Sequence, residues 1–176
     1  MGHNQGIDIS SVALKPLGGK NLEAALAKAD QYLALNEPVE AESICRDVLT
    51  EDPVNQRCLR TLGLSLTDMF AHEWTRHFDE AIQVFEKLTS PYEVAYYSGV
   101  AWERCAKAQL AHDQARNAAH SLEEALALFE KAQELGPADA PDPVLRWNRC
   151  VRAIALHPEL GRALRAEHPH EFQHGD

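Results

Sequence analysis

Apolar and polar residues recur along most of the chain with the period of an α-helix. From Asn21 onward one apolar stripe contains Leu22, Ala25, Leu26, Ala29, Tyr32 and Leu33. Apolar positions three and four residues apart fall on one face of a helix. Later stripes predict further helices over about 38–50, 54–71, 77–88, 91–111, a sixth ending near Leu135, and a seventh over 143–156. No segment alternates with the period of two that marks a strand, so the chain is predicted to be all-α.

Proline and glycine divide these helices and set the predicted domain limits. Pro38, Pro53, Pro91 and the Gly136-Pro137 pair each follow an apolar stripe, and a residue before proline is pushed out of the helical region. Residues 1–20 are Gly-rich and have no helical period, so they are predicted to form a flexible N-terminal segment. The helical domain is predicted over 21–157. A polar, His-rich tail follows over 158–176, with one helical turn near Leu160–Ala166.

A short pattern occurs three times, and Ala41, Ala81 and Ala125 begin its copies: AESICRDVL, AIQVFEKL and ALALFEKA. The residue four positions after the alanine is Cys45, Phe85 or Phe129, and the residue seven positions after it is Val48, Leu88 or Ala132. Such recurrence is typical of stacked helical units, none of which can bury its apolar face alone.

These copies resemble the tetratricopeptide repeat over about 22–157. The first repeat is matched by Ala29, Tyr32, Ala41, Cys45, Val48 and Pro53. The second is matched by Leu59, Leu62, Gly63, Leu66, Ala81, Phe85 and Leu88. The third is clear only in Ala125, Phe129, Ala132 and Pro137, and its first helix has more than one register around Tyr97, Gly99 and Ala101. The resemblance implies an α-solenoid of about three helix-turn-helix repeats, with a C-terminal capping helix that includes Trp147.

Two insertions interrupt the repeated pattern. About six extra residues, Phe70–Thr75, separate the halves of the second repeat, and a longer insertion lies near 107–120. Trp74 is therefore predicted between two helices, either as a packed lid or as an exposed binding anchor. Gly63 lies inside a predicted helix, where glycine costs about 1 kcal/mol relative to alanine. Close backbone packing against Ala81 would explain that glycine.

In this family the first helices of the pairs line a concave groove that holds an extended peptide or a helix of another protein. The resemblance therefore implies a scaffold or adaptor with no catalytic residues and no cofactor. The groove residues it implies are Asp30, Leu33, Arg57, Arg60, Leu64, Asp68, Trp102, Asn148 and Arg152. Trp102 and neighbouring tyrosines would anchor the partner.

The arginines suggest the chemistry of that partner. Arg57 and Arg60 are three residues apart and share a helix face, and Arg149 and Arg152 have the same spacing. The planar guanidinium group suits carboxylates, so an acidic peptide or a chain terminus is the expected ligand. The alternative is that these arginines pair with Asp and Glu inside the array.

Composition narrows the classes of partner and compartment. The chain has 176 residues and a net charge of -10, which disfavours binding to nucleic acid. The four cysteines form no CxxC motif and are expected as buried apolar residues. The N-terminal residues lack the apolar stretch expected of a signal peptide, and there is no run of about 18 apolar residues that could span a membrane. A cytoplasmic location is expected.

The sequence leaves two further functions open. A self-assembling subunit would pack its apolar cap or the Trp74 insertion against a second copy. A metal-binding protein would use His170 and His174, which are four residues apart in the tail. Pro169 disfavours a preformed site there, so no metal site is predicted. His72-Glu73 is not an HExxH motif because the second histidine, His77, comes one position too late. No phosphate-binding loop or nucleophile elbow is present.

Overall fold

The structure, a computed structural model, describes residues 13–167 apart from the side chains of His72 and Glu167. Within this range there is no strand, and a short 3-10 turn at Gly19–Asn21 precedes eight helices. These are α1 (Leu22–Ala34), α2 (Pro38–Glu51), α3 (Gln56–Asp68), α4 (Phe70–Phe85), α5 (Pro91–Ala111), α6 (Ala115–Leu135), α7 (Asp142–Leu156) and α8 (Pro158–Glu167). The predicted all-α class is confirmed. The residues of the N-terminal segment before Ala13 and the histidines of the tail lie outside the described range.

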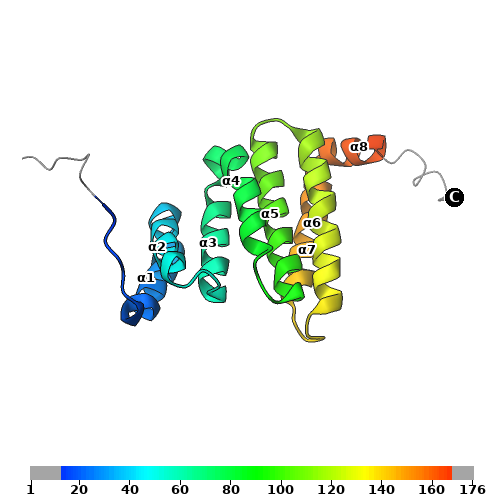
Figure 1. Cartoon of the computed structure of the whole chain (residues 1–176). Coiled ribbons are helices and arrows are strands. Elements are labelled where there is room, and N and C mark those ends of the chain that lie inside the picture. The colour runs from blue at the N-terminus through cyan, green and yellow to red at the C-terminus, as the bar shows by residue number, and fades with distance from the viewer. Residues whose placement is uncertain (1–12, 168–176) are drawn as a thin grey trace, which may run out of the picture.

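The helices follow one another in chain order, with α1 and α2 at one end of the molecule and α7 and α8 at the other (Figure 1). Each helix packs against the next along the chain. In addition, α1 contacts α3, α3 contacts α5, and α5 contacts α7. Among the described helices, α2 and α4 have no comparable contact with each other, and neither do α4 and α6.

Two groups of buried residues form the core. The first group lies between α1, α2, α3 and α4 and includes Leu26, Val48, Leu59, Leu66 and Phe85. The second joins α5, α6, α7 and α8 and includes Val100, Leu122, Phe129, Cys150 and Leu160. Helix α5 contributes to both, because Ala101 and Cys105 face the first group and Val100 and Ala106 face the second. Helix α5 therefore joins the two halves of the molecule.

The insertion around Trp74 is helical, which corrects the sequence prediction. Helix α4 begins at Phe70, one residue after α3 ends, and the backbone leaves helical dihedral angles only at Glu73 (φ -139°, ψ 46°). Phe70 is buried, and Trp74 and Phe78 pack against the same core. Because these aromatic residues are four apart, a helical path brings all three rings to the core. Trp74 is thus a packed residue and not an exposed anchor in a loop.

The longer insertion near 107–120 is also largely helical. Helices α5 and α6 have 21 residues each, and only three residues separate them. Ala108 of α5 and Ala118 and Ala119 of α6 are buried, so the extra turns add small residues to the contact between these helices.

The chain after residue 157 also departs from the prediction. Instead of one helical turn, the ten-residue helix α8 packs against α6 and α7. Leu160 is fully buried in the second core group, and Leu164 packs against that group. The packed body therefore extends beyond the predicted boundary at residue 157.

Gly63 is closely packed, as expected, but against a different residue. A β-carbon on Gly63 would lie 2.1 Å from Cε1 of Phe85, and the prediction had named Ala81. Phe85 is one helical turn beyond Ala81, and its ring reaches across to the α3 backbone. Gly99 has the same relation to Phe129, with a distance of 2.8 Å.

Candidate functional site

The predicted binding residues lie on four helices that touch in succession: α1, α3, α5 and α7. We call their combined outer face the first-helix surface. Asp30 and Leu33 come from α1; Arg57, Arg60, Leu64 and Asp68 from α3; Trp102 from α5; and Asn148 and Arg152 from α7. Ion pairs connect each of these helices to the next.

The first of these connections joins α1 to α3. Nη2 of Arg57 lies 2.6 Å from Oδ2 of Asp30, and Nη1 of Arg57 lies 3.2 Å from Oε2 of Glu23. The hydroxyl of Thr61 donates to the other oxygen of Asp30 over 2.8 Å. Arg57 and Asp30, both predicted for a groove, therefore bind each other.

Two ion pairs join α3 to α5. Arg60 Nη1 lies 2.9 Å from Glu93 Oε1, and Arg104 Nη1 lies 2.7 Å from Asp68 Oδ1. Arg104 also donates to the Thr67 hydroxyl and to the carbonyl of Leu64. Burial raises the pKa of the Asp68 carboxyl, although the positive charge of Arg104 acts in the opposite direction. Arg60 and Asp68 are thus also used in contacts between helices.

The third connection joins α5 to α7. It consists of one carboxylate and two guanidinium groups. Glu103, whose side chain is only 8% exposed, accepts from Arg146 Nη1 over 3.0 Å and from Arg149 Nε over 2.6 Å. One carboxylate is thus shared by two guanidinium groups, and neither arginine has a second ion-pair partner among the described residues. The Arg149 side chain remains 61% exposed. A cation therefore stays accessible at this connection between α5 and α7.

A cavity of about 340 Å³ adjoins these arginines. It is lined by Tyr96 of α5 and by Asp142, Leu145, Arg146 and Arg149 of α7. The ring of Tyr96 stacks on Tyr92 with centroids 6.0 Å apart. The cavity therefore offers an aromatic face, an aliphatic side chain and a guanidinium group within one small space.

Other predicted site residues are placed apart from this cavity. The Trp102 ring packs edge-on against Phe78 of α4, with centroids 4.6 Å apart, and lies 5.9 Å from the His120 ring of α6. Since its neighbours belong to α4 and α6, Trp102 does not join the arginines of the first-helix surface. Asn148 is half-buried, and Arg152 is exposed and makes no ion pair with another described residue.

Sequence reasoning missed Leu145 and Arg146, and it included Tyr96 only among the tyrosines that neighbour Trp102. The signals were present, because Tyr92 and Tyr96 are four residues apart and Arg146 and Arg149 are three apart. Because the register of the third repeat is uncertain from the sequence, the sequence does not specify which side of α5 faces α7. In addition, no feature of the sequence indicates that Glu103 would bind both arginines.

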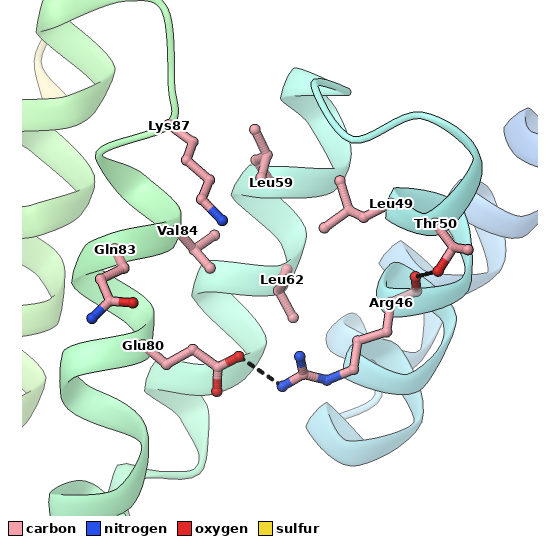
Figure 2. Close-up of a pocket in the computed structure, with 9 residues that line it drawn as sticks. All are labelled: Arg46, Leu49, Thr50, Leu59, Leu62, Glu80, Gln83, Val84 and Lys87. Carbon is pink, nitrogen blue, oxygen red and sulfur yellow. Dashed lines mark hydrogen bonds and ion pairs between the residues drawn. The ribbon is translucent and has the colours of Figure 1, made fainter.

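A second cavity, of about 390 Å³, lies between α2 and α4 and over α3 (Figure 2). Its apolar lining consists of Leu49, Leu59, Leu62 and Val84. An ion pair of 2.9 Å between Arg46 of α2 and Glu80 of α4 crosses this groove. Arg46 also binds Glu42 at 2.6 Å, so its charge is compensated by two carboxylates.

His77 of α4 does not form a metal site with the side chains described around it. His77 Nε2 lies 3.6 Å from Glu73 Oε2, and His77 Nδ1 is buried without a hydrogen-bond partner. No group of three side chains suited to a metal ion occurs between residues 13 and 167. His170 and His174 of the tail fall outside the described residues.

Comparison with known proteins leaves the chain without a family assignment. Neither a protein-family model nor a curated protein matches its sequence. None of the described helices has the length and apolar character needed to cross a membrane.

Proposed function

We propose that the chain is a tetratricopeptide-like array of about three helix pairs with a capping helix. The packing supports this arrangement. Successive first helices contact each other, whereas the second helices α2 and α4 stand apart with a groove between them. Over α1–α5, where the first helices touch and the second helices stand apart, a row of helix pairs would bend toward the first helices. The first-helix surface would then be the concave face, as in helical repeats that bind partners there.

The proposed function is that of an adaptor that binds an acidic segment of a partner protein on this face. The observation that carries the proposal is the pair of arginines sharing Glu103 beside Tyr96. A partner carboxylate next to Arg149 would give this exposed guanidinium group, which shares Glu103 with Arg146, a second acceptor of charge-assisted hydrogen bonds. Tyr96 and Leu145 would contact an adjacent apolar side chain of the partner, and Asp142 would repel a second acidic group.

Arg57 and Arg60 have a smaller part in this proposal than the sequence suggested. Each already binds a carboxylate of a neighbouring helix, Asp30 or Glu93. A ligand carboxylate would have to replace that internal partner, and such an exchange brings little net gain. We therefore place the recognition of acidic groups at the α5–α7 cavity.

A binding role in a reducing compartment agrees with the remaining chemistry. All four cysteines are unpaired and buried, as expected of apolar residues in a reduced protein. The charged side chains of the first-helix surface are mostly engaged in ion pairs between helices, where they hold the helices in register. We propose no catalytic step for them.

Selection of peptides from a displayed random library, followed by fluorescence anisotropy, tests this function. Peptides with an acidic residue beside an aromatic or aliphatic one should be enriched. Arg149→Ala should weaken their binding at least tenfold, equivalent to about 1.4 kcal/mol. Arg116→Ala changes an exposed arginine of α6 and serves as the matched control. Equal binding to both variants, with unchanged melting temperatures, would contradict the proposal.

A further inference from the structure

The first two and the last two helices differ in the sign of their charge. Between Lys20 and Asp52 the sequence has three basic and eight acidic residues, whereas between Asp142 and Glu167 it has five basic and three acidic residues. The first segment contains α1 and α2 and the second contains α7 and α8, which lie at opposite ends of the molecule (Figure 1). The chain as a whole has a net charge of -10, so the basic end is an exception to an acidic surface.

Exposed apolar side chains gather at the basic end. Of ten large apolar side chains that are exposed within the described range, five belong to α7. Val144, Trp147 and Val151, which are 37–40% exposed, have the i, i+3, i+7 spacing of a single flank of the helix. We call these three residues the α7 stripe. They are distinct from Leu145 and Arg149, which belong to the cavity with Tyr96. The same two helices, α7 and α8, have three exposed arginines: Arg152, Arg162 and Arg165.

A smaller apolar patch occurs at the acidic end. Leu35 is 60% exposed and Val39 is 57% exposed, and they flank the turn between α1 and α2. Glu37 and Glu40 are exposed beside them, and neither makes an ion pair with another described residue. We call these four residues the α1–α2 patch. It is an apolar surface with acidic neighbours, whereas the α7 stripe has basic ones.

We propose that the α7 stripe docks on the α1–α2 patch of a second copy of this chain, head to tail. This arrangement covers apolar surface on both partners and brings the basic end of one copy to the acidic end of the next. A two-fold contact between two α7 helices would bring two basic ends together. A head-to-tail contact uses two different surfaces, so it leaves one of each free and extends to further copies.

Complementation between two variants gives a direct test, with mass measured by sedimentation velocity across a wide range of protein concentration. Val151→Asp disables the α7 stripe, and Glu37→Arg/Glu40→Arg disables the α1–α2 patch. The wild-type mass should rise with concentration beyond that of a dimer. Each variant alone should need at least tenfold higher concentration to associate. Their equimolar mixture should form a dimer that grows no further, because one intact stripe meets one intact patch.

Controls separate this contact from general stickiness. Val54→Asp introduces the same charge at an apolar residue that is 73% exposed, and it should leave the association unchanged. Added salt should weaken the association, because it screens attraction between opposite charges. If Val151→Asp loses helical circular dichroism, Trp147→Ser replaces it. The proposal is overturned by a wild-type protein that is monomeric at every concentration, and equally by a mixture of variants that stays monomeric.

Discussion

The ring of Phe85 occupies the space that a side chain at position 63 would need. A β-carbon on Gly63 would come within 2.1 Å of Phe85 Cε1, and one on Gly99 within 2.8 Å of Phe129 Cε1. Both phenylalanines are fully buried. The corresponding positions of the first copy of the pattern hold Ala29 and Cys45, both also fully buried. The first-helix position is therefore glycine where the second-helix position is phenylalanine, and it is alanine where the second-helix position is the smaller cysteine.

Gly63→Ala should lower the free energy of unfolding by about 1–3 kcal/mol. The clash with Phe85 outweighs the gain of about 1 kcal/mol that alanine normally brings to a helix. Urea denaturation followed by circular dichroism measures the difference. Gly161→Ala is the matched control, because its β-carbon would meet only the Arg165 guanidinium, at 3.5 Å, and it should stabilise the protein. A Gly63→Ala protein as stable as the wild type would show that the ring moves freely.

The same contact predicts a coupling between the two positions. Phe85→Leu alone should destabilise the protein, because it removes part of a buried ring. In the double variant Gly63→Ala/Phe85→Leu, the smaller side chain leaves room for the new methyl group. The double variant should therefore lose less stability than the two single changes added together, by at least about 0.5 kcal/mol. Strict additivity would mean that the two residues do not interact.

Glu103→Gln should destabilise the protein by on the order of 2 kcal/mol, because a buried acceptor of two charged donors is lost. Glu80→Gln provides a comparison on the opposite side of the molecule. Glu80 also binds an arginine, but the Arg46 and Glu80 side chains are 48% and 39% exposed. A pair so exposed contributes at most about 1 kcal/mol. Thermal unfolding of both variants tests whether Glu103→Gln loses more stability than Glu80→Gln. Equal losses of stability would contradict the prediction.

His77→Leu should raise the free energy of unfolding by up to about 1 kcal/mol. Nδ1 of His77 is buried without a partner, and an unpaired polar atom in the core is costly. His112→Leu, at an exposed position, serves as control and should have little effect. A clear loss of stability in His77→Leu, measured by urea denaturation, would indicate that the imidazole makes a polar contact important for folding.

The helices could be predicted from the sequence because their signals are local. Stripes of apolar residues and the prolines at 38, 91 and 137 marked helix boundaries within a few residues. The prediction failed where the family pattern was taken as a guide to length. Trp74 was assigned to an insertion between two helices, although its spacing of four from both Phe70 and Phe78 continues a helix. The four-residue spacing of the aromatic residues indicated the extent of this helix better than the repeat length of the family did.

The site was harder to predict because it depends on pairing between distant residues. Arg57 lies 27 positions from Asp30, and Arg149 lies 46 positions from Glu103. These long-range partners, together with the side of α5 that faces α7, determine which arginine side chain remains exposed. The sequence indicates an arginine-rich surface opposite acidic residues. Only the packed structure distinguishes Arg57, which is bound to Asp30, from the more exposed Arg149.

The buried thiols stabilise the folded protein, and this stabilisation should decline at alkaline pH. Burial raises the pKa of Cys105 to about 11 and that of Cys150 to about 12, from an ordinary value of 9.0. Above pH 9 the unfolded chain releases thiol protons that the folded chain retains. Stability from these groups is therefore complete below pH 9 and is lost as the pH rises through 11. The loss by pH 10 should be on the order of 1 kcal/mol for each thiol.

Urea denaturation at pH 8 and pH 10 measures this decline. Because lysine and tyrosine side chains also titrate in that range, the comparison is with Cys105→Ala/Cys150→Ala, in which the decline should be smaller. In the native wild type at pH 8, a thiol reagent should label Cys105 and Cys150 only as fast as the protein unfolds, since both side chains are buried and protonated. Rapid labelling without unfolding would mean that these thiols reach solvent, and equal pH dependence in both proteins would remove them as its cause.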